Sequence, residues 1–194
     1  MSESHDIKVP AYENVVLRGG CRCGNITYTS TALPSSMGHC HCLACRQASG
    51  SPYQTFASFP TDSLTWTTHT SRGLSIGNTS DESGLTTYEA NPWARRGFCA
   101  NCGSPMRLHA ATSPGWMSIV AGSIDEGSVK GELTKPTEHI FLKEKAGWFD
   151  LPEDGLGRFE RFSDAESDRK IKAWKEEHGG KGEPEVRLAF ICLT

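Results

Sequence analysis

Seven of the eight cysteines stand in three short groups, and this spacing constrains the fold more than any other feature of the sequence. The groups are Cys21-Arg22-Cys23, Cys40-His41-Cys42-Leu43-Ala44-Cys45 and Cys99-Ala100-Asn101-Cys102. Side chains alternate along an extended backbone, so a Cys-x-Cys pair places both sulfurs on one face. A Cys-x-x-Cys pair needs a tight turn, and Gly103 after the last pair tolerates the backbone angles of such a turn. Each group can therefore chelate a metal ion.

The cysteine content favours free or metal-bound thiols over disulfides. Eight cysteines in 194 residues are well below the fraction of about 8–10% that is typical of a disulfide scaffold. Residues 1–20 contain no apolar stretch like that of a signal peptide, so we expect a reducing, cytoplasmic setting where disulfides do not persist. Clustered cysteines in such a chain are predicted to bind metal.

Ligand counting divides the seven clustered cysteines between two zinc sites. A closed structural site takes four protein ligands, whereas a catalytic site takes three and keeps one position for water or substrate. The open site is expected at Cys40, Cys42 and Cys45. The closed site is expected at the two remaining pairs, Cys21, Cys23, Cys99 and Cys102, which would tie early and late strands together.

Spacing alone leaves two other arrangements open. In one, a single ribbon-like zinc site combines two Cys-x-x-Cys pairs, Cys42 with Cys45 and Cys99 with Cys102, and the other thiols bind nothing. In the other, four thiolates hold an iron–sulfur cluster.

The polar residues around the central group are candidates for supporting roles. If residues 39–42 are extended, the cysteines face the metal and His39 and His41 face the other way. Both histidines are therefore expected to be supporting or surface groups rather than ligands. His41 and Arg46 are candidates to orient a substrate or to tune the metal, beside the equally open alternative that they contact only backbone or solvent.

Short apolar stretches between turn-forming residues predict a mainly β protein. The predicted strands lie in residues 15–20, 25–30, 53–59, 63–68, 86–90, 105–110 and 115–123. Residues 163–178 predict one peripheral helix, with Ser163 and Glu166 in the positions of a capping box. Residues 185–193 predict a final strand, in which Cys192 is expected to be a small buried side chain rather than a ligand.

Charge and hydropathy argue against two classes of partner. The net charge is −3, the mean hydropathy is −0.44, and no basic cluster of the kind that binds a phosphate backbone is present. No apolar run approaches the length of about 18 residues that a membrane span needs. We therefore expect neither nucleic acid nor a membrane as a partner.

Several segments together resemble the family of the glutathione-dependent formaldehyde-activating enzyme, also called the CENP-V/GFA domain. The segments are RGGCRCGNITY, GHCHCLACRQASGS, RRGFCANCGSPM, AGSIDE and HIFLKEKAGWFDLPEDGLGRFE, in the family's order and spacing. The resemblance covers about residues 15–162. It implies an N-terminal extension at 1–14, the domain at 15–162, and a C-terminal segment at 163–194 with the helix and the predicted final strand.

The resemblance also implies a fold, two metal sites and an activity. The fold is a complex Mss4-like β fold built around two Zn²⁺ ions, one structural and one catalytic. The family's structural site corresponds here to Cys21, Cys23, Cys99 and Cys102, and its catalytic site to Cys40, Cys42 and Cys45. The implied activity is that of a carbon–sulfur lyase, S-(hydroxymethyl)glutathione synthase, with a small-molecule thiol or thiol–aldehyde adduct, such as that of glutathione, as its substrate. Two other functions stay open: a carrier of thiol adducts without catalysis, and a zinc-stabilised interaction module.

Overall fold

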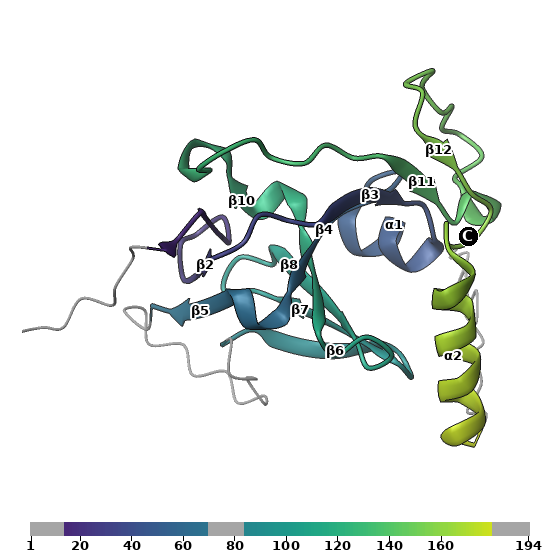
Figure 1. Cartoon of the computed structure of the whole chain (residues 1–194), viewed down its shortest axis with the longest axis horizontal. Helices are drawn as coiled ribbons and strands as arrows, with labels where there is room; N and C mark the ends of the chain where they lie inside the picture. The colour runs from purple at the N-terminus through teal and green to yellow at the C-terminus, as the bar shows by residue number, and fades with distance from the viewer. Residues whose placement is uncertain (1–13, 70–83, 180–194) are drawn as a thin grey trace, which may run out of the picture.

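The computed structural model describes residues 14–69 and 84–179, and this part of the chain is mainly β (Figure 1). One sheet contains β1 (Leu17–Gly20), β2 (Ile26–Ser30), β5 (Leu64–Thr68) and β10 (Ile124–Asp125). The other contains β3 (Ser36–Cys40), β4 (Gln54–Pro60), β6 (Thr86–Asn91), β7 (Ala94–Phe98), β8 (Pro105–Ala110), β9 (Trp116–Val120), β11 (Glu138–Ile140) and β12 (Gly157–Arg158). The two α-helices are α1 (Leu43–Ser49) and α2 (Ala165–Glu177).

The strand order brings distant segments of the chain together. The smaller sheet has the order β10-β1-β2-β5, and the larger has the order β12-β11-β3-β4-β9-β8-β7-β6. Neighbouring strands from β3 to β6 are antiparallel, whereas β11 pairs in parallel with β3 and places His139 opposite His39. The end of β3, which carries the central cysteines, therefore lies beside a segment about a hundred residues later in the sequence.

A shared apolar core joins the two sheets. Its largest fully buried side chains include Tyr28, Phe59 and Ile119. The Tyr28 hydroxyl lies 3.1 Å from Ser123 Oγ, and burial raises the pKa of this phenol to about 12. Gly19 lies against the same ring: a Cβ at this position would come within 2.3 Å of it, so only glycine fits.

All seven predicted strand stretches contain a strand of the structure, whereas the strands β3, β7, β10, β11 and β12 and the helix α1 were not predicted. In β7 the buried positions include Arg96, and a charged residue at a buried position hides the alternating pattern that identifies strands. The short helix α1 begins inside the central cysteine group, with Cys42 as its N-cap, and ends at Gly50 in the left-handed region. The predicted strand at 185–193, with Cys192, lies outside the described residues.

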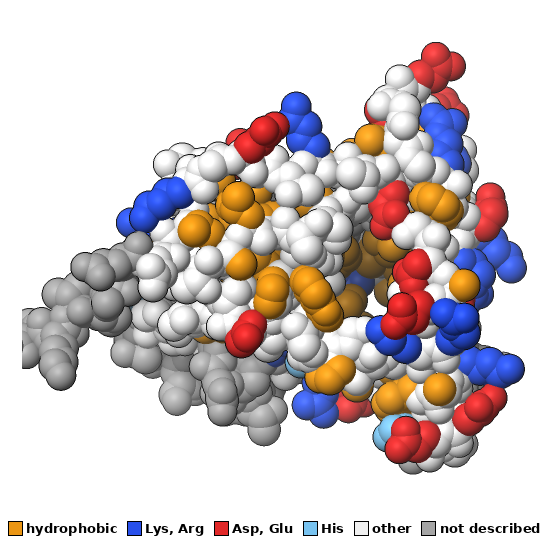
Figure 2. All heavy atoms as spheres, in the orientation of Figure 1, with side chains coloured by type: hydrophobic (Ala, Val, Ile, Leu, Met, Phe, Trp, Pro, Cys, Tyr) orange, Lys and Arg blue, Asp and Glu red, His pale blue; other side chains and the backbone are white. Residues whose placement is uncertain are grey.

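Helix α2 is peripheral, as predicted, and none of its residues is buried. Its N-cap is Asp164 and not Ser163 as the capping-box pattern indicated, because the Asp164 carboxylate accepts a 2.7 Å hydrogen bond from the Ser167 N–H. Side chains of both charges surround this helix at the right edge of the molecule (Figure 2). Within residues 14–69 and 84–179, no helix is long and apolar enough to cross a membrane.

Candidate metal centres

The first candidate centre is formed by Cys21, Cys23, Cys99 and Cys102, whose four sulfurs all lie within 4.8 Å of one another. The Sγ atoms of Cys21 and Cys23 are 3.5 Å apart, and those of Cys23 and Cys99 are 3.8 Å apart. A tetrahedral zinc ion with Zn–S bonds of about 2.3 Å requires sulfur–sulfur distances of about 3.8 Å. The four-cysteine group therefore fits a zinc ion with a complete set of protein ligands.

Two tight turns aim these sulfurs at one point. One turn follows β1 and the other joins β7 to β8, and each contains a glycine with φ near +73°, Gly24 and Gly103. The turns are also linked by a hydrogen bond, in which the Arg22 N–H donates to Ser104 Oγ over 3.1 Å. The Asn101 amide donates to Cys23 Sγ over 3.0 Å, and this bond is the main cause of the lowered pKa of Cys23. The group thus connects the two sheets.

The second candidate centre is formed by Cys40, Cys42 and Cys45, with all three sulfurs within 4.8 Å of one another. Cys40 ends β3, Cys42 caps α1 and Cys45 lies in its first turn. No further histidine, cysteine or carboxylate in the described part of the chain joins this group. The ribbon-like alternative is not formed, because Cys42 and Cys45 group with Cys40 and not with the Cys99 pair.

The thiols of the three-cysteine group differ in pKa because their sulfurs lie close together. Hydrogen bonds from Cys40 and Cys45 lower the pKa of Cys42 to about 3. The hydrogen bond with Cys42 is the main cause that raises the pKa of Cys40 well above its usual value. A cation among the sulfurs favours the thiolate form of all three, so metal binding here releases protons.

Arg96 reaches the three-cysteine group from β7, and sequence reasoning did not identify it. Its Nη2 donates to Cys45 Sγ over 3.0 Å and its Nη1 donates to Gln54 Oε1 over 2.8 Å. The side chain is 5% exposed, and its guanidinium lies 5.8 Å from the centre of the Phe56 ring. Two arginines stand side by side in the sequence, and only the alternation of β7 shows that Arg96 shares the inner face with Ala94.

His41 does not belong to the three-cysteine group, and it is fully buried. Its Nε2 lies 2.9 Å from His139 Nδ1, and His139 Nε2 lies 3.0 Å from the Asp154 carboxylate. The hydrogen bond from His139 lowers the pKa of Asp154, which is ionised and can only accept. His139 therefore donates from Nε2 to Asp154, and a second hydrogen bond joins its Nδ1 to His41 Nε2.

The other nitrogen of the His41 ring, Nδ1, lies outside this chain of hydrogen bonds. Burial is the main cause that lowers the pKa of His41 to about 4, so the ring is neutral at pH 7. His41 Nδ1 and Arg46 Nε are both buried and have no hydrogen-bond partner among residues 14–69 and 84–179. The other predicted supporting residue, His39, bonds Thr55 Oγ1 through its Nδ1 over 2.8 Å.

The comparison with protein families decides where this chain belongs. The family described as glutathione-dependent formaldehyde-activating enzyme, GFA, matches residues 16–144, well over half of the chain. The chain is a member of the GFA family. Membership agrees with the predicted Mss4-like fold, and the mainly β prediction is confirmed. Each of the two cysteine groups of this GFA protein could hold a metal ion.

No curated protein matches the chain. Among solved structures, the GFA chain is similar to the crystal structure of a Rhodobacter sphaeroides protein, a Northeast Structural Genomics target. The two share 18% sequence identity, and the alignment covers 60% of this chain and 97% of the other, with a TM-score of 0.42.

Proposed function

We propose that this GFA protein is a zinc-dependent carbon–sulfur lyase that forms or cleaves a thiol–aldehyde adduct such as S-(hydroxymethyl)glutathione. The observation that carries the proposal is the three-cysteine group, which offers three ligands where a closed zinc site has four. The family's description as glutathione-dependent and formaldehyde-activating supports this substrate class. We place the activity in the cytoplasm, because the clustered thiols must stay reduced.

The two cysteine groups have different roles in this proposal. Cys21, Cys23, Cys99 and Cys102 hold a structural zinc ion, because four thiolates leave no position for a substrate. Cys40, Cys42 and Cys45 would hold the catalytic ion with three protein ligands, one fewer than a closed zinc site has. When bound there, zinc supplies the positive charge that favours the thiolate form of a substrate sulfur.

The reaction itself is an addition. The sulfur–carbon bond forms, the carbonyl π bond of the aldehyde opens, and the thiol proton ends on the new hydroxyl oxygen. The reverse reaction returns that proton to sulfur and releases the aldehyde.

Arg96 completes the charge balance of the proposed catalytic site. Three thiolates and one Zn²⁺ sum to −3 + 2 = −1, and the guanidinium that donates to Cys45 Sγ brings the total to zero. A neutral buried assembly costs less desolvation free energy than a charged one. Arg96 therefore stabilises the cysteine group in its metal-binding, deprotonated form.

His41, His139 and Asp154 hold the segment between two of the ligands in place. The His41 side chain is anchored by His139, and the His41 backbone N–H donates to the Ile140 carbonyl over 3.0 Å. Both bonds tie the loop between Cys40 and Cys42 to the neighbouring strand β11. The loop thus presents its cysteines from a fixed backbone, which pre-organises the proposed site.

A rate measurement at fixed glutathione and formaldehyde tests the proposal. Nuclear magnetic resonance exchange with ¹³C-formaldehyde measures how fast the adduct forms and breaks, with and without the zinc-loaded protein. We expect the protein to accelerate the exchange and Cys42→Ser to abolish the acceleration. Cys192→Ser makes the same chemical change outside the three cysteine groups, and it should retain the rate of the unmodified protein.

Two outcomes would contradict the proposal. If the zinc-loaded protein binds glutathione but leaves the exchange rate unchanged, the protein is a carrier. If a folded Cys42→Ser protein keeps full acceleration, the three-cysteine group takes no part in the reaction.

A further inference from the structure

We propose that Gln54 is a further catalytic residue, whose side-chain amide donates a hydrogen bond to the oxygen atom of the aldehyde. This inference rests on the proposed function and deepens it, because it assigns the group that binds the oxygen end of the adduct. Gln54 begins β4, and its side chain is 3% exposed. Its Nε2 atom is buried and has no hydrogen-bond partner within the part of the chain that the structure describes.

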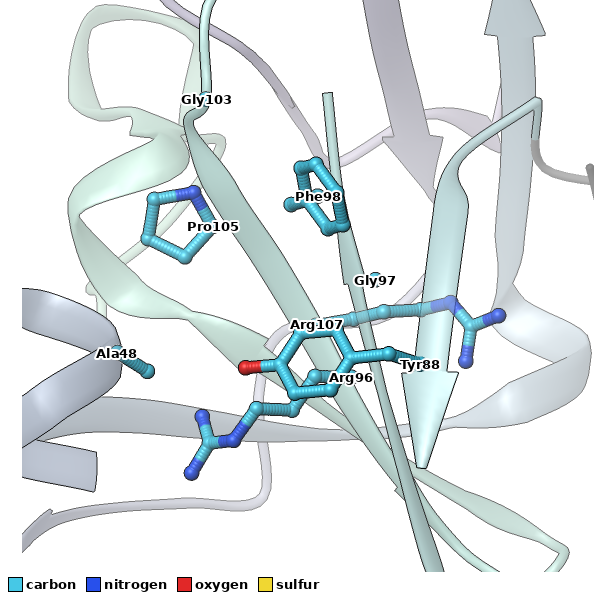
Figure 3. A pocket seen from close by; sticks show the side chains of 8 residues that line it. All are labelled: Ala48, Tyr88, Arg96, Gly97, Phe98, Gly103, Pro105 and Arg107. Carbon is cyan, nitrogen blue, oxygen red and sulfur yellow. The ribbon is translucent and has the colours of Figure 1, made fainter. Parts of the chain in front are cut away.

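Arg96 orients the Gln54 amide. A guanidinium can only donate hydrogen bonds, so the amide oxygen must face it, and Arg96 Nη1 donates to Gln54 Oε1 over 2.8 Å. Nη2 of the same guanidinium donates to Cys45 Sγ over 3.0 Å. Figure 3 shows the Arg96 side chain extending toward Ala48 of α1, the helix that carries Cys45. Arg96 therefore occupies the oxygen of the amide, and both N–H donors of Nε2 stay available for another acceptor.

Strand pairing places Gln54 beside the three-cysteine group. Cys40 and Gln54 are directly opposite partners in the antiparallel pair of β3 and β4, so their side chains project from the same face of the larger sheet. The Cβ atoms of opposite partners are about 4.5–5.5 Å apart. Both side chains are buried. The Gln54 amide therefore borders Cys40 directly and is connected to Cys45 through Arg96.

An unpaired buried donor beside these cysteines calls for an acceptor, because leaving it unpaired costs free energy. In the proposed reaction the aldehyde oxygen is that acceptor. As the sulfur–carbon bond forms, the π electrons of the carbonyl group move onto the oxygen, which then takes up the thiol proton. The Gln54 amide keeps its own protons and donates only a hydrogen bond, which strengthens as negative charge develops on the oxygen. Gln54 thus stabilises the transition state more than the ground state.

Nuclear magnetic resonance can observe this amide directly, because the sequence contains only two glutamines, Gln47 and Gln54. The zinc-loaded protein is labelled with ¹⁵N in its glutamine side chains, and Gln47→Glu removes one of the two signals and so assigns both. Gln47 is exposed on α1 and serves as the internal control. Two compounds are added separately: S-(hydroxymethyl)glutathione, formed from glutathione and formaldehyde, and S-ethylglutathione, in which a methyl group replaces the hydroxyl.

We expect the hydroxymethyl adduct to shift the proton signals of the Gln54 amide to higher frequency. S-ethylglutathione should leave them in place, and the Gln47 signals should move with neither compound. An unshifted Gln54 amide overturns the inference, and so do equal shifts with both compounds. A shift that zinc alone produces and the adduct leaves unchanged also overturns it, because the amide then contacts a cysteine sulfur.

Exchange rates with ¹³C-formaldehyde separate this inference from the proposed function. Gln54→Glu keeps an oxygen for Arg96 and replaces the N–H donors by a second oxygen. It should lower the catalysed rate about 100-fold, a typical loss for one such donor, at unchanged zinc content. Gln47→Glu introduces the same charge on the exposed neighbour and should keep the rate.

Equal rates of a folded Gln54→Glu protein and of Gln47→Glu overturn the inference and leave the lyase proposal standing. A Gln54 shift that only the hydroxymethyl adduct produces, in a protein that does not accelerate exchange, supports the contact with the oxygen and rejects the lyase proposal. If Gln54→Glu does not fold, the amide signals of the unmodified protein decide.

Discussion

Arg96→Met is expected to destabilise the zinc-loaded protein by at least about 2.5 kcal/mol. The substitution leaves Gln54 Oε1 without its 2.8 Å donor, and this side chain is 3% exposed. An unsatisfied buried acceptor costs about 1–3 kcal/mol, and a lost charge-assisted bond, here the one to Cys45 Sγ, costs about 1.5–3 kcal/mol. The sum is about 2.5–6 kcal/mol, and we expect the lower end because methionine keeps the apolar contacts of the stem.

Arg95→Met is the matched control, because it changes the same residue type by the same charge on the same strand. Arg95 faces outward and pairs with Glu89 over 3.4 Å, with the two side chains 67% and 69% exposed. Such an exposed ion pair contributes about 0–1 kcal/mol. Urea unfolding of the zinc-loaded proteins measures both variants, with zinc content determined on the same samples.

The two variants should therefore differ by at least about 1.5 kcal/mol in unfolding free energy. At about 2–4 °C per kcal/mol for a chain of this size, thermal unfolding of the same samples should show a difference in melting temperature of at least about 3 °C. Equal unfolding midpoints for Arg95→Met and Arg96→Met would refute it, since the buried hydrogen bonds of Arg96 would then contribute nothing. A loss of zinc from Arg96→Met with no change in Arg95→Met would support the role of Arg96 in charge balance.

Three further predictions concern the metal ions, the buried imidazoles and the C-terminal helix. Cys42→Ser should lose one metal ion per chain and remain folded, whereas Cys99→Ser should lose the ion that links the two sheets and unfold, as metal analysis and circular dichroism would show. Asp154→Asn removes the carboxylate that orients the imidazole pair, so a chelator should extract metal faster from one of the two sites; an unchanged rate contradicts the positioning role. Asp164→Ala removes the N-cap of α2 and should cost about 1 kcal/mol at pH 7. A hydrogen bond from a backbone N–H lowers the pKa of Asp164 in the folded state. Its contribution is therefore present above the ordinary aspartate pKa and is lost as pH falls through the lowered value, so urea unfolding should find that variant and parent converge in acid.

The strands that were predicted correctly are those whose own sequence marks one buried face. The seven strand stretches carry alternating or β-branched residues that mark one buried face, and each contains a strand. Strand β3 was not predicted because Gly38 and His39 interrupt its apolar pattern. Its extended backbone is stabilised by pairing with β11, a contact that the local sequence does not reveal. The N-cap of α2 was misassigned by one residue because Ser163 and Asp164 are both good caps, and the choice between them depends on which side chain reaches the Ser167 N–H.

The division of the seven clustered cysteines into four and three was predictable from the sequence by itself, because metal ligands follow fixed numbers and short spacings. The tertiary structure alone decided which other residues meet these cysteines. Arg96 lies 51 residues from Cys45 and reaches it because the larger sheet places β7 opposite α1, and His139 reaches His41 because β11 pairs with β3. Such contacts depend on the order in which strands pair over the whole chain, and no short segment of sequence contains that order.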